Sequence, residues 1–268
     1  MRLLLLCCIL FSQLCVATKL QDRVAIVTGG SQGIGEAICY AYAREGATVV
    51  VINKHNPEAG KKVAATIQAA GGRAIACAVD VADPVAVCSC IKQVMQQYGR
   101  IDILVNNAAI LICKPIEQYT LAEWQMTLDV NLTGAFLMTQ AVVPIMKQQR
   151  YGKIICITSI VSSVGFPDCS AYCASKGGLL MFVKALVPEL ASYGINVNAI
   201  SPGNTITPMT EPERQDEAFV AMIQQRTPSG VAYMAAADVA HAAVFLASDD
   251  ARSMQGLDLV VDGGWCAI

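Results

Sequence analysis

Val24 to Gly35 reads VAIVTGGSQGIG, and a helical pattern follows it from Glu36 to Glu45. The apolar run at 24–27 predicts a buried strand, and the glycines after it predict a tight turn. Glycines let a backbone approach a pyrophosphate, while the start of a helix offers unpaired N–H groups and a partial positive charge. A glycine-rich turn without a ligand is the alternative, but strand and helix flank this turn as a phosphate-binding turn requires. The stretch therefore predicts the first unit of a nucleotide-binding α/β domain.

Strand-like and helix-like segments alternate along the rest of the chain. We expect strands at 48–52, 74–79, 103–105, 152–158, 195–200 and 257–261. We expect helices at 57–70, 84–98, 121–149 (broken or bent near Pro144), 171–192 and 238–247. This alternation predicts one parallel, doubly wound sheet with right-handed crossovers, and the apolar strands predict helices on both of its faces. The polar segment 204–227 interrupts the pattern and is typical of a lid or substrate lobe.

Composition excludes several classes of function. The chain has 268 residues, of which 54% are hydrophobic and 15% charged, so it can bury the core of one α/β domain. The net charge is −2 and no basic run occurs, which argues against nucleic-acid binding. The two histidines, His55 and His241, stand apart from one another, so we expect no histidine-based metal site.

The chain contains twelve cysteines without a CxxC pair or a regular spacing. Most of them fall within apolar segments, so we interpret them as small buried hydrophobes of a protein from a reducing compartment. Oxidation of Cys173, which lies in the candidate site described below, is a secondary interpretation.

The first 18 residues form a separate extension in this interpretation. Met1-Arg2 is followed by an apolar run from Leu3 to Leu14, and Cys15-Val16-Ala17 offers small residues as at a cleavage site. Three alternatives stay open: a cleaved secretory signal, a membrane-associating anchor, or an extension from an upstream start codon. We expect the catalytic domain at 19–268, a cytoplasmic location from its cofactor and cysteine usage, and membrane contact only if the extension is retained.

The segment from Ser159 to Lys176 joins an apolar strand to a helix. If Tyr172 lies in the first turn of that helix, Lys176 lies on the same face, and its ammonium group can sit against the phenol. A nearby positive charge favours the phenolate, so we expect a lowered pKa of Tyr172 that suits acid/base catalysis. A tyrosine and a lysine at this spacing are often only a surface pair. Ser159 favours the catalytic interpretation because it ends a strand, where open α/β sheets bind ligands.

Seven motifs follow one another along the chain in a characteristic order. They are Thr28-Gly29-x-x-x-Gly33-x-Gly35, Asp80-Val81, Asn106-Asn107-Ala108-Ala109, Asn131, Ser159, Tyr172-x-x-x-Lys176 and Pro202-Gly203. Together they closely resemble the short-chain dehydrogenase/reductase family from about Lys19 to the C-terminus. The resemblance implies a single Rossmann-type domain with strand order 3-2-1-4-5-6-7. It also implies an NAD(P)-dependent oxidoreductase that transfers a hydride between nicotinamide and a secondary alcohol or ketone.

The resemblance implies a role for each residue of a catalytic set. Tyr172 would be the general acid/base, and Lys176 would lower the pKa of the phenol and bind the nicotinamide ribose. Ser159 would hydrogen-bond the substrate oxygen and so position the reacting carbon. Asn131 would hold a water in a proton relay to the lysine, although an asparagine inside a helix can instead bond only to backbone.

The resemblance also implies a set of cofactor-binding residues. They are Thr28, Gly29, Ser31, Gln32, Gly33, Ile34, Gly35, Asn53, Lys54, Asp80, Val81, Asn107, Ala108, Tyr172, Lys176, Pro202, Gly203, Thr205 and Thr207. Asp80 and Val81 would frame the adenine ring, and Asn107 would steady the turn. Ala109 departs from the glycine that is usual in the family, which puts the local backbone path in question.

Asn53 and Lys54 bear on the choice of cofactor. An acidic residue at the end of the second strand would bind the adenine-ribose hydroxyls and repel a 2′-phosphate. A neutral residue followed by a cation suits that phosphate, so we expect NADP(H), with NAD(H) as the alternative. Gln32, which stands where many NADP-preferring relatives carry a basic residue, weakens this expectation.

We expect a small carbonyl or alcohol substrate, without identifying it. The resemblance extends to sugars or polyols, 3-oxoacyl thioesters, steroids and small cyclic ketones. Apolar residues suggest the walls of the substrate pocket, namely Ile110, Leu111, Ile112, Cys113, Val161, Phe166 and Met209. Family analogy predicts a homodimer or homotetramer formed through helices 121–149 and 171–192 and the C-terminal strand. A catalytically silent dinucleotide-binding sensor or scaffold is the alternative function, because a fold alone does not establish catalysis.

Overall fold

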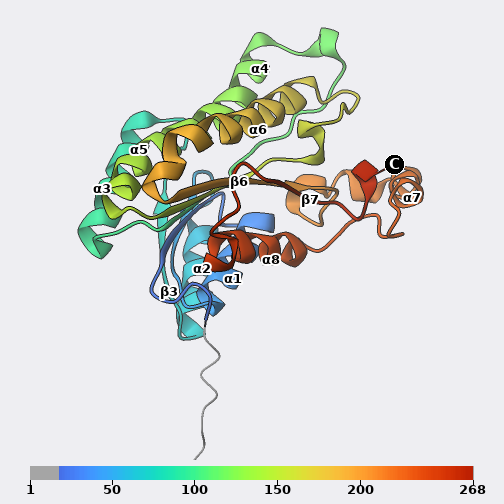
Figure 1. Ribbon diagram of the computed structural model, residues 1–268. Helices are drawn as coiled ribbons and strands as arrows, with labels where there is room; N and C mark the ends of the chain where they lie inside the picture. The colour runs from blue at the N-terminus through green and yellow to red at the C-terminus, as the bar shows by residue number, and fades with distance from the viewer. Residues whose placement is uncertain (1–17, 268) are drawn as a thin grey trace, which may run out of the picture.

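In the computed structural model, which describes residues 18–267, a parallel sheet lies between two layers of helices (Figure 1). The strands are β1 (Val24–Thr28), β2 (Thr48–Asn53), β3 (Arg73–Ala78), β4 (Ile103–Asn106), β5 (Gly152–Ile157), β6 (Ile195–Pro202) and β7 (Asp258–Val261). Their order in the sheet is β3-β2-β1-β4-β5-β6-β7, and all neighbouring pairs are parallel. The predicted fold class and strand order are confirmed.

The helices cover both faces of this sheet (Figure 1). On one face lie α1 (Gly33–Arg44), α2 (Pro57–Ala69) and α8 (Ala236–Ala247). On the other lie α3 (Pro84–Tyr98), α4 (Leu121–Leu128), α5 (Gly134–Gln149) and α6 (Ser170–Leu190). A further helix, α7 (Glu217–Arg226), lies near the C-terminus, away from both layers. The strand order reverses between β1 and β4, and an open α/β sheet forms its ligand crevice at such a point, beyond the carboxyl ends of the strands.

The core consists of two large apolar clusters, one on each face of the sheet. In β1, Ala25 and Val27 belong to one cluster, while Val24 and Ile26 belong to the other. Successive side chains of a strand point to opposite faces, so a strand covered on both sides must be apolar throughout. This packing holds the carboxyl ends of the strands in fixed positions beneath the candidate site.

The region predicted as one helix at 121–149 is irregular at a different place from the one expected. The chain keeps helical geometry through Pro144, and the departure lies earlier, in a π-helical segment at Asp129–Thr133 between α4 and α5. This segment includes Asn131, whose side chain bonds to a neighbouring loop and to α6. Single π-helical turns inside α-helices frequently occur at functional sites.

Among the described residues, one helical stretch, Leu121–Gln149, is long and apolar enough to cross a membrane. Met138, Val142 and Met146 of this stretch lie in the core cluster on their face of the sheet. Core packing therefore accounts for part of its apolar composition. The predicted N-terminal extension lies at 1–18, and all of it except residue 18 is outside the described part of the chain.

The interpretation of the cysteines is wrong for one pair. Cys39, Cys77, Cys90 and Cys156 are buried free thiols, as expected, but Cys113 and Cys169 form a disulfide. The two residues are 56 positions apart in sequence, so no local spacing reveals the pair. The fold brings together the loop after β4 and the loop before α6.

Candidate active site

A cavity of about 340 Å³ opens at the carboxyl ends of β1, β4, β5 and β6. Of the site residues predicted from the sequence, most line this cavity: Gly29, Ser31, Gln32, Gly33, Ile34, Asn53, Lys54, Asp80, Val81, Asn107, Ala108, Ser159, Tyr172, Lys176, Pro202, Gly203, Thr205 and Thr207. Thr28, Gly35 and Asn131 do not line the cavity themselves, but they contact residues that do. The structure thus brings together segments that are up to 190 residues apart, as Gly29 and Phe219 illustrate.

The glycine turn between β1 and α1 has the features of an anion-binding turn. Gly33 has a φ of +57°, a backbone conformation that residues other than glycine rarely adopt. A Cβ at Gly35 would collide with the carbonyl oxygen of Gly29. Gln32 precedes α1 without capping it through its side chain, so the first N–H groups of the helix remain available to a ligand. The turn therefore fits a dinucleotide pyrophosphate.

Thr28 and Asn107 fasten the glycine turn to the end of β4. The hydroxyl of Thr28 accepts the backbone N–H groups of Asn107 at 2.9 Å and Ala108 at 3.0 Å. The Asn107 side-chain amide in turn donates to the carbonyl of Thr28 at 2.8 Å. Ala109 follows without a positive φ, so the backbone path accepts alanine where the family usually has glycine.

At the far end of the cavity, Asn53 and Lys54 follow β2. The Oδ1 atom of Asn53 is buried without a hydrogen-bond partner in the structure. Lys54 forms an ion pair with Asp80, with 2.6 Å between Nζ and Oδ2. Burial alone would raise the pKa of Asp80, but the hydrogen bonds from Lys54 and from the Ala82 backbone outweigh it, and the pKa is lowered. An unpartnered buried acceptor and a neighbouring cation at the cavity edge fit the adenosine end of a dinucleotide.

Tyr172 and Lys176 lie one turn apart at the start of α6, as expected. The Lys176 ammonium lies 5.6 Å from the centroid of the Tyr172 ring and donates to the carbonyl of Ile157 at 2.7 Å. Burial lowers the pKa of Lys176 to about 8. Ser159, which caps a short 3₁₀ turn at Ile160–Ser162, faces the same cavity.

The pKa expected for Tyr172 is wrong for the protein alone. Burial raises the pKa of Tyr172 to about 12, although a hydrogen bond with Ser159 acts in the lowering direction. Lys176 does not lower the pKa of Tyr172, because burial in the same environment disfavours the charged form of the lysine. The neutral phenol is therefore the stable form, and it is a proton donor.

Asn131 lies in the π-helical segment, and its contacts are with protein groups. Its Oδ1 accepts the N–H of Ile110 at 2.8 Å, and its Nδ2 donates to the Ile110 carbonyl at 3.0 Å and to Ser175 Oγ at 3.1 Å. The Ser175 hydroxyl donates to the Tyr172 carbonyl at 2.7 Å. These bonds match the alternative of a helix asparagine bonded to backbone, and they connect the loop after β4 with the first turn of α6.

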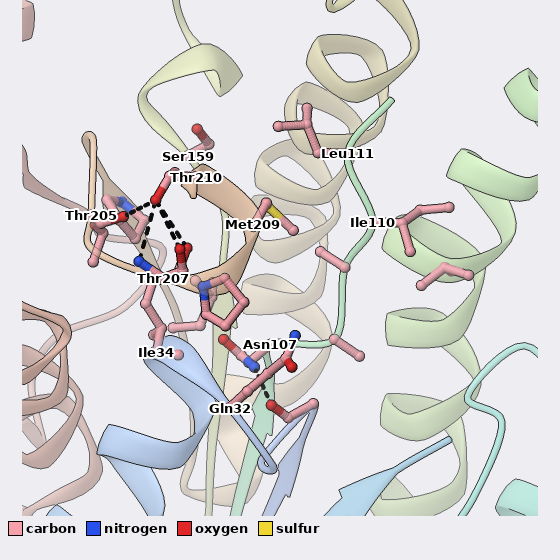
Figure 2. A pocket seen from close by; sticks show the side chains of 18 of the residues that line it. Gln32, Ile34, Asn107, Ile110, Leu111, Ser159, Thr205, Thr207, Met209 and Thr210 are labelled. Atoms are coloured by element: carbon pink, nitrogen blue, oxygen red, sulfur yellow. Dashed lines mark hydrogen bonds between the residues drawn. The ribbon is translucent and has the colours of Figure 1, made fainter. Parts of the chain in front are cut away.

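The segment after β6 closes one side of the cavity. Thr210 donates to the carbonyl of Thr205 at 2.7 Å, and Thr207 packs so closely on the glycine turn that a Cβ at Gly33 would lie 3.2 Å from it. Figure 2 shows this segment between Ile34 of the glycine turn and Ser159, with Met209 on its inner side. The polar segment predicted as a lid or substrate lobe therefore forms part of the cavity wall.

Apolar residues line the substrate end of the cavity. Five of the seven predicted wall residues do so: Ile110, Leu111, Val161, Phe166 and Met209. Figure 2 shows Ile110 and Leu111 on the side opposite the Thr205 to Thr210 segment. Ile112 and Cys113 are not among the lining residues. Sequence reasoning missed Glu213 and Phe219, for which the only signal was the general expectation that 204–227 forms a lid or substrate lobe.

The arrangement supports one kind of chemistry. The glycine turn, a hydroxyl and a phenol face one cavity that is otherwise largely apolar. A dinucleotide fits the row of lining residues from the glycine turn to Lys176. Among the described residues, His, Cys, Asp and Glu form no cluster of three or more that could hold a metal ion. The proton-donating phenol beside a hydroxyl can polarise a carbonyl oxygen.

Known proteins resemble the chain over nearly its whole length. A family model described as short chain dehydrogenase matches residues 23–218. A 3-oxoacyl-(acyl-carrier-protein) reductase of Synechocystis sp. is 40% identical over 250 residues, which are 92% of this chain and 98% of the relative. A cyclopentanol dehydrogenase of Comamonas sp. is 36% identical over 249 residues, or 93% of this chain and 99% of the relative.

A solved structure agrees with these relatives. The gluconate 5-dehydrogenase of Burkholderia cenocepacia J2315, in complex with NADP and tartrate, superposes with a TM-score of 0.90 at 33% identity and covers 94% of this chain and 98% of its own. The chain therefore belongs to the short chain dehydrogenase family, whose members are oxidoreductases of CH–OH and C=O groups.

Proposed function

We propose that this protein transfers a hydride between NADP(H) and a secondary alcohol or ketone, with Tyr172, Ser159 and Lys176 as catalytic residues and Asn131 as a positioning residue. The observation that carries the proposal is the convergence of Ser159, Tyr172 and Lys176 with the glycine turn on one cavity. When bound, the nicotinamide supplies or accepts the hydride. A silent sensor is not favoured, because the similar proteins are named dehydrogenases and reductases.

Tyr172 moves the proton in this mechanism. In reduction its neutral phenol donates to the developing alkoxide, and in oxidation the phenolate accepts the proton of the alcohol. Ser159 donates a hydrogen bond to the same substrate oxygen and fixes its position. Lys176, buried one turn further along α6, holds its ammonium at the Ile157 carbonyl and binds the ribose. Asn131 positions the loop that carries Ile110 against α6.

The cofactor end supports NADP(H) over NAD(H). Asn53 brings no negative charge to the end of β2, and Lys54 offers a cation at the cavity edge. A 2′-phosphate carries negative charge, which Lys54 attracts and an acidic residue would repel. Lys54 is held in an ion pair with Asp80. When the 2′-phosphate binds, the lysine must either leave Asp80 or contact both groups.

Substitution of Tyr172 by phenylalanine tests the proposal. Tyr172→Phe keeps the ring and removes the transferable proton, so we expect kcat to fall by about 10²- to 10⁴-fold. The dissociation constant for NADPH, measured by fluorescence titration, should change by less than about threefold, since the cofactor turn is untouched. The activity assay follows nicotinamide absorbance with NADPH and NADH against a panel of ketones and oxoacyl thioesters.

Tyr193→Phe is the matched control, because Tyr193 stacks beneath Lys147 and does not line the cavity. It should leave both kcat and NADPH binding unchanged. Near-normal turnover in Tyr172→Phe would move the acid/base to another residue. Tight NADPH binding without turnover of any carbonyl by the wild type would support the sensor instead.

We also propose a catalytic domain that begins near Lys19 and acts in the cytoplasm as a homo-oligomer. The Lys19 backbone N–H bonds to the Glu45 carboxylate at 2.8 Å, which supports this boundary. A protein expressed from Lys19 should match the full chain in activity. Fractionation of cells that express the full chain tests the location: recovery in the membrane pellet would indicate a retained anchor.

A further inference from the structure

Glu213 places a carboxylate in the wall of the candidate active site. It begins a short 3₁₀ turn at Glu213–Gln215, between the segment that covers the glycine turn and α7. It lines the cavity together with Tyr172, Met209 and Phe219 and is partly buried there. Burial raises the pKa of Tyr172, and the negative charge of Glu213 adds a smaller increase, as expected for two acidic groups that line one cavity.

Glu213 differs from its acidic neighbours because the described part of the chain gives it no partner. Glu211, two residues earlier, forms an ion pair with Arg214 and accepts a hydrogen bond from Gln215. Arg214 further donates through Nη2 to the Thr207 carbonyl, while its buried Nε has no hydrogen-bond partner in the structure and does not bond to Glu213. Glu213 itself makes no hydrogen bond or ion pair with a described residue, and burial raises its pKa. A carboxylate held in this way lacks a hydrogen-bond donor.

No described residue that lines the cavity donates a hydrogen bond to Glu213. Phe166 and Phe219 form an edge-to-face pair with ring centroids 6.5 Å apart. Among the described lining residues, the lysines and arginines are Lys54, which is paired with Asp80 at the adenosine end, and Lys176, which is bonded to the Ile157 carbonyl. The substrate end thus offers an anionic ligand no free cation, and it presents a negative charge.

We propose that Glu213 determines substrate specificity by accepting a hydrogen bond from a second hydroxyl group of a neutral substrate, and that it excludes carboxylates and other anions. The substrate class is a neutral hydroxy ketone and its corresponding diol. The reacting oxygen lies at Ser159 and Tyr172, the carbon skeleton lies against the phenylalanine pair, and the second hydroxyl meets Glu213. This inference rests on the proposed oxidoreductase function and specifies its substrate.

Three four-carbon ketones test the inference because they differ only at the terminal carbon. They are 4-hydroxybutan-2-one, which is neutral with a hydroxyl, butan-2-one, which lacks it, and 3-oxobutanoate, which is anionic. For the wild type we expect kcat/KM with NADPH to fall in that order. Hydrogen bonds to charged groups are strong, so Glu213→Leu should reduce the preference for the hydroxy ketone over butan-2-one by about 10- to 100-fold. Glu213→Gln should keep part of this preference and improve turnover of 3-oxobutanoate by about tenfold, since it removes the repulsion.

Glu211→Gln is the matched control, because Glu211 lies in the same segment but does not line this cavity. It should leave all three ratios unchanged. Thermal denaturation and NADPH titration of each variant establish that fold and cofactor binding persist. Unchanged ratios in both Glu213 variants would overturn this inference alone. If the wild type reduced other carbonyls of the panel but none of these three ketones, this inference alone would fall. If it bound NADPH and reduced no carbonyl of the panel, the proposed function would fall with it.

Discussion

At the residue scale, burial shifts the pKa values of Tyr172 and Lys176 in opposite directions. It raises the pKa of the phenol and lowers that of the ammonium, so it disfavours the charged form of both groups. At neutral pH the folding cost falls on Lys176, because the phenol of Tyr172 is neutral in both the folded and the unfolded chain. Active sites commonly trade stability for such arrangements.

Lys176 should make the stability of the cofactor-free protein depend on pH. The folded chain releases the Lys176 proton near pH 8, whereas the unfolded chain holds it to a pKa of 10.5. Between these values the unfolded state binds more protons, so stability rises with pH, by at most about 3 kcal/mol. Below pH 8 both states are protonated and the cost of burial is fully present. Lys176→Met should remove this rise, which urea denaturation between pH 7.5 and 10 measures.

Other titrating groups affect wild type and variant alike, so the difference between the two stability curves isolates Lys176. Lys184→Met, on an exposed position of α6, serves as the control and should keep the wild-type slope. A wild-type slope in Lys176→Met would show that Lys176 is not protonated differently in the folded chain.

Lys54 should set the preference between the two nicotinamide cofactors. Lys54→Ala removes the cation at the cavity edge, and we expect the ratio of kcat/KM for NADP to that for NAD to fall by about tenfold at low salt. Because the Lys54 side chain is 47% exposed, the effect should shrink as ionic strength rises. Lys61→Ala, an exposed lysine of α2, should leave the ratio unchanged. An unchanged ratio in Lys54→Ala would remove this residue from the explanation of cofactor choice.

Individual residues could be predicted from the sequence where a motif fixes the backbone around them. The glycine turn and the spacing of Tyr172 and Lys176 are local, so their positions followed directly. The pKa of Tyr172 did not follow, because it depends on how deeply the surrounding chain buries the phenol. Glu213 was missed for a related reason: nothing in its neighbours along the sequence indicates that the short turn faces the cavity.

At the element scale, the loop after β4 and the loop before α6 act as one unit beside the substrate end. The Cys113 to Cys169 disulfide connects them, and the backbone N–H of Lys114 donates to the carbonyl of Asp168 at 2.7 Å. Asp168 has a φ of +61°, which turns the chain toward α6. Cys169 itself lines the cavity, so the position of this unit affects the cavity wall.

The disulfide should stabilise the protein and narrow the substrate end. Cys113→Ser opens a loop of 56 residues, and we expect it to lower the free energy of unfolding by about 2 to 4 kcal/mol. Freer loops should raise KM for the ketone a few-fold and leave NADPH binding unchanged. Urea denaturation and steady-state kinetics, each with and without dithiothreitol, measure these effects.

Cys88→Ser, an exposed free cysteine of α3, is the control and should behave as the wild type does. Dithiothreitol should shift the wild type to the behaviour of Cys113→Ser and leave that variant unaffected. Equal stability of oxidised wild type and Cys113→Ser would contradict a stabilising role for the disulfide.

Elements with strong periodicity followed from the sequence, whereas irregular ones did not. Strands such as β2 carry a continuous apolar run, here Val49 to Ile52, because both of their faces are covered, and this pattern is visible without a structure. The π-helical segment at Asp129–Thr133 has no such signature, since it depends on the bonds of Asn131 to Ile110 and Ser175. Pro144 suggested a break that α5 does not make.

At the scale of the whole molecule, the order of the strands explains why distant motifs meet. The chain moves outward from β1 to β3 and then returns to β4 on the other side of β1, so the crevice opens between the two halves of the sheet. The glycine turn after β1, the loop after β4 and Ser159 after β5 all lie at this edge. Alternating strands and helices predicted the layers, but the strand order came from the family resemblance.

The helix layer of α4, α5 and α6 leaves large apolar side chains exposed. Leu121 and Met126 of α4 are 81% and 47% exposed, Phe136 of α5 is 42% exposed, and Met181 of α6 is 62% exposed. Phe136 also packs edge-to-face on Phe182 of α6, with ring centroids 6.3 Å apart. Apolar side chains gathered on one face of a protein are typical of an interaction surface.

We expect this face to associate with the same face of a second copy. Light scattering at micromolar concentration should give the mass of a dimer or tetramer. A charge buried at an apolar interface is costly, so Phe136→Glu and Met181→Glu should each shift the mass toward that of the monomer. Val85→Glu is the control, because Val85 is 76% exposed on α3, and it should keep the wild-type mass. A monomeric wild type would contradict the expectation, and an unchanged mass in both variants would move the interface to another surface.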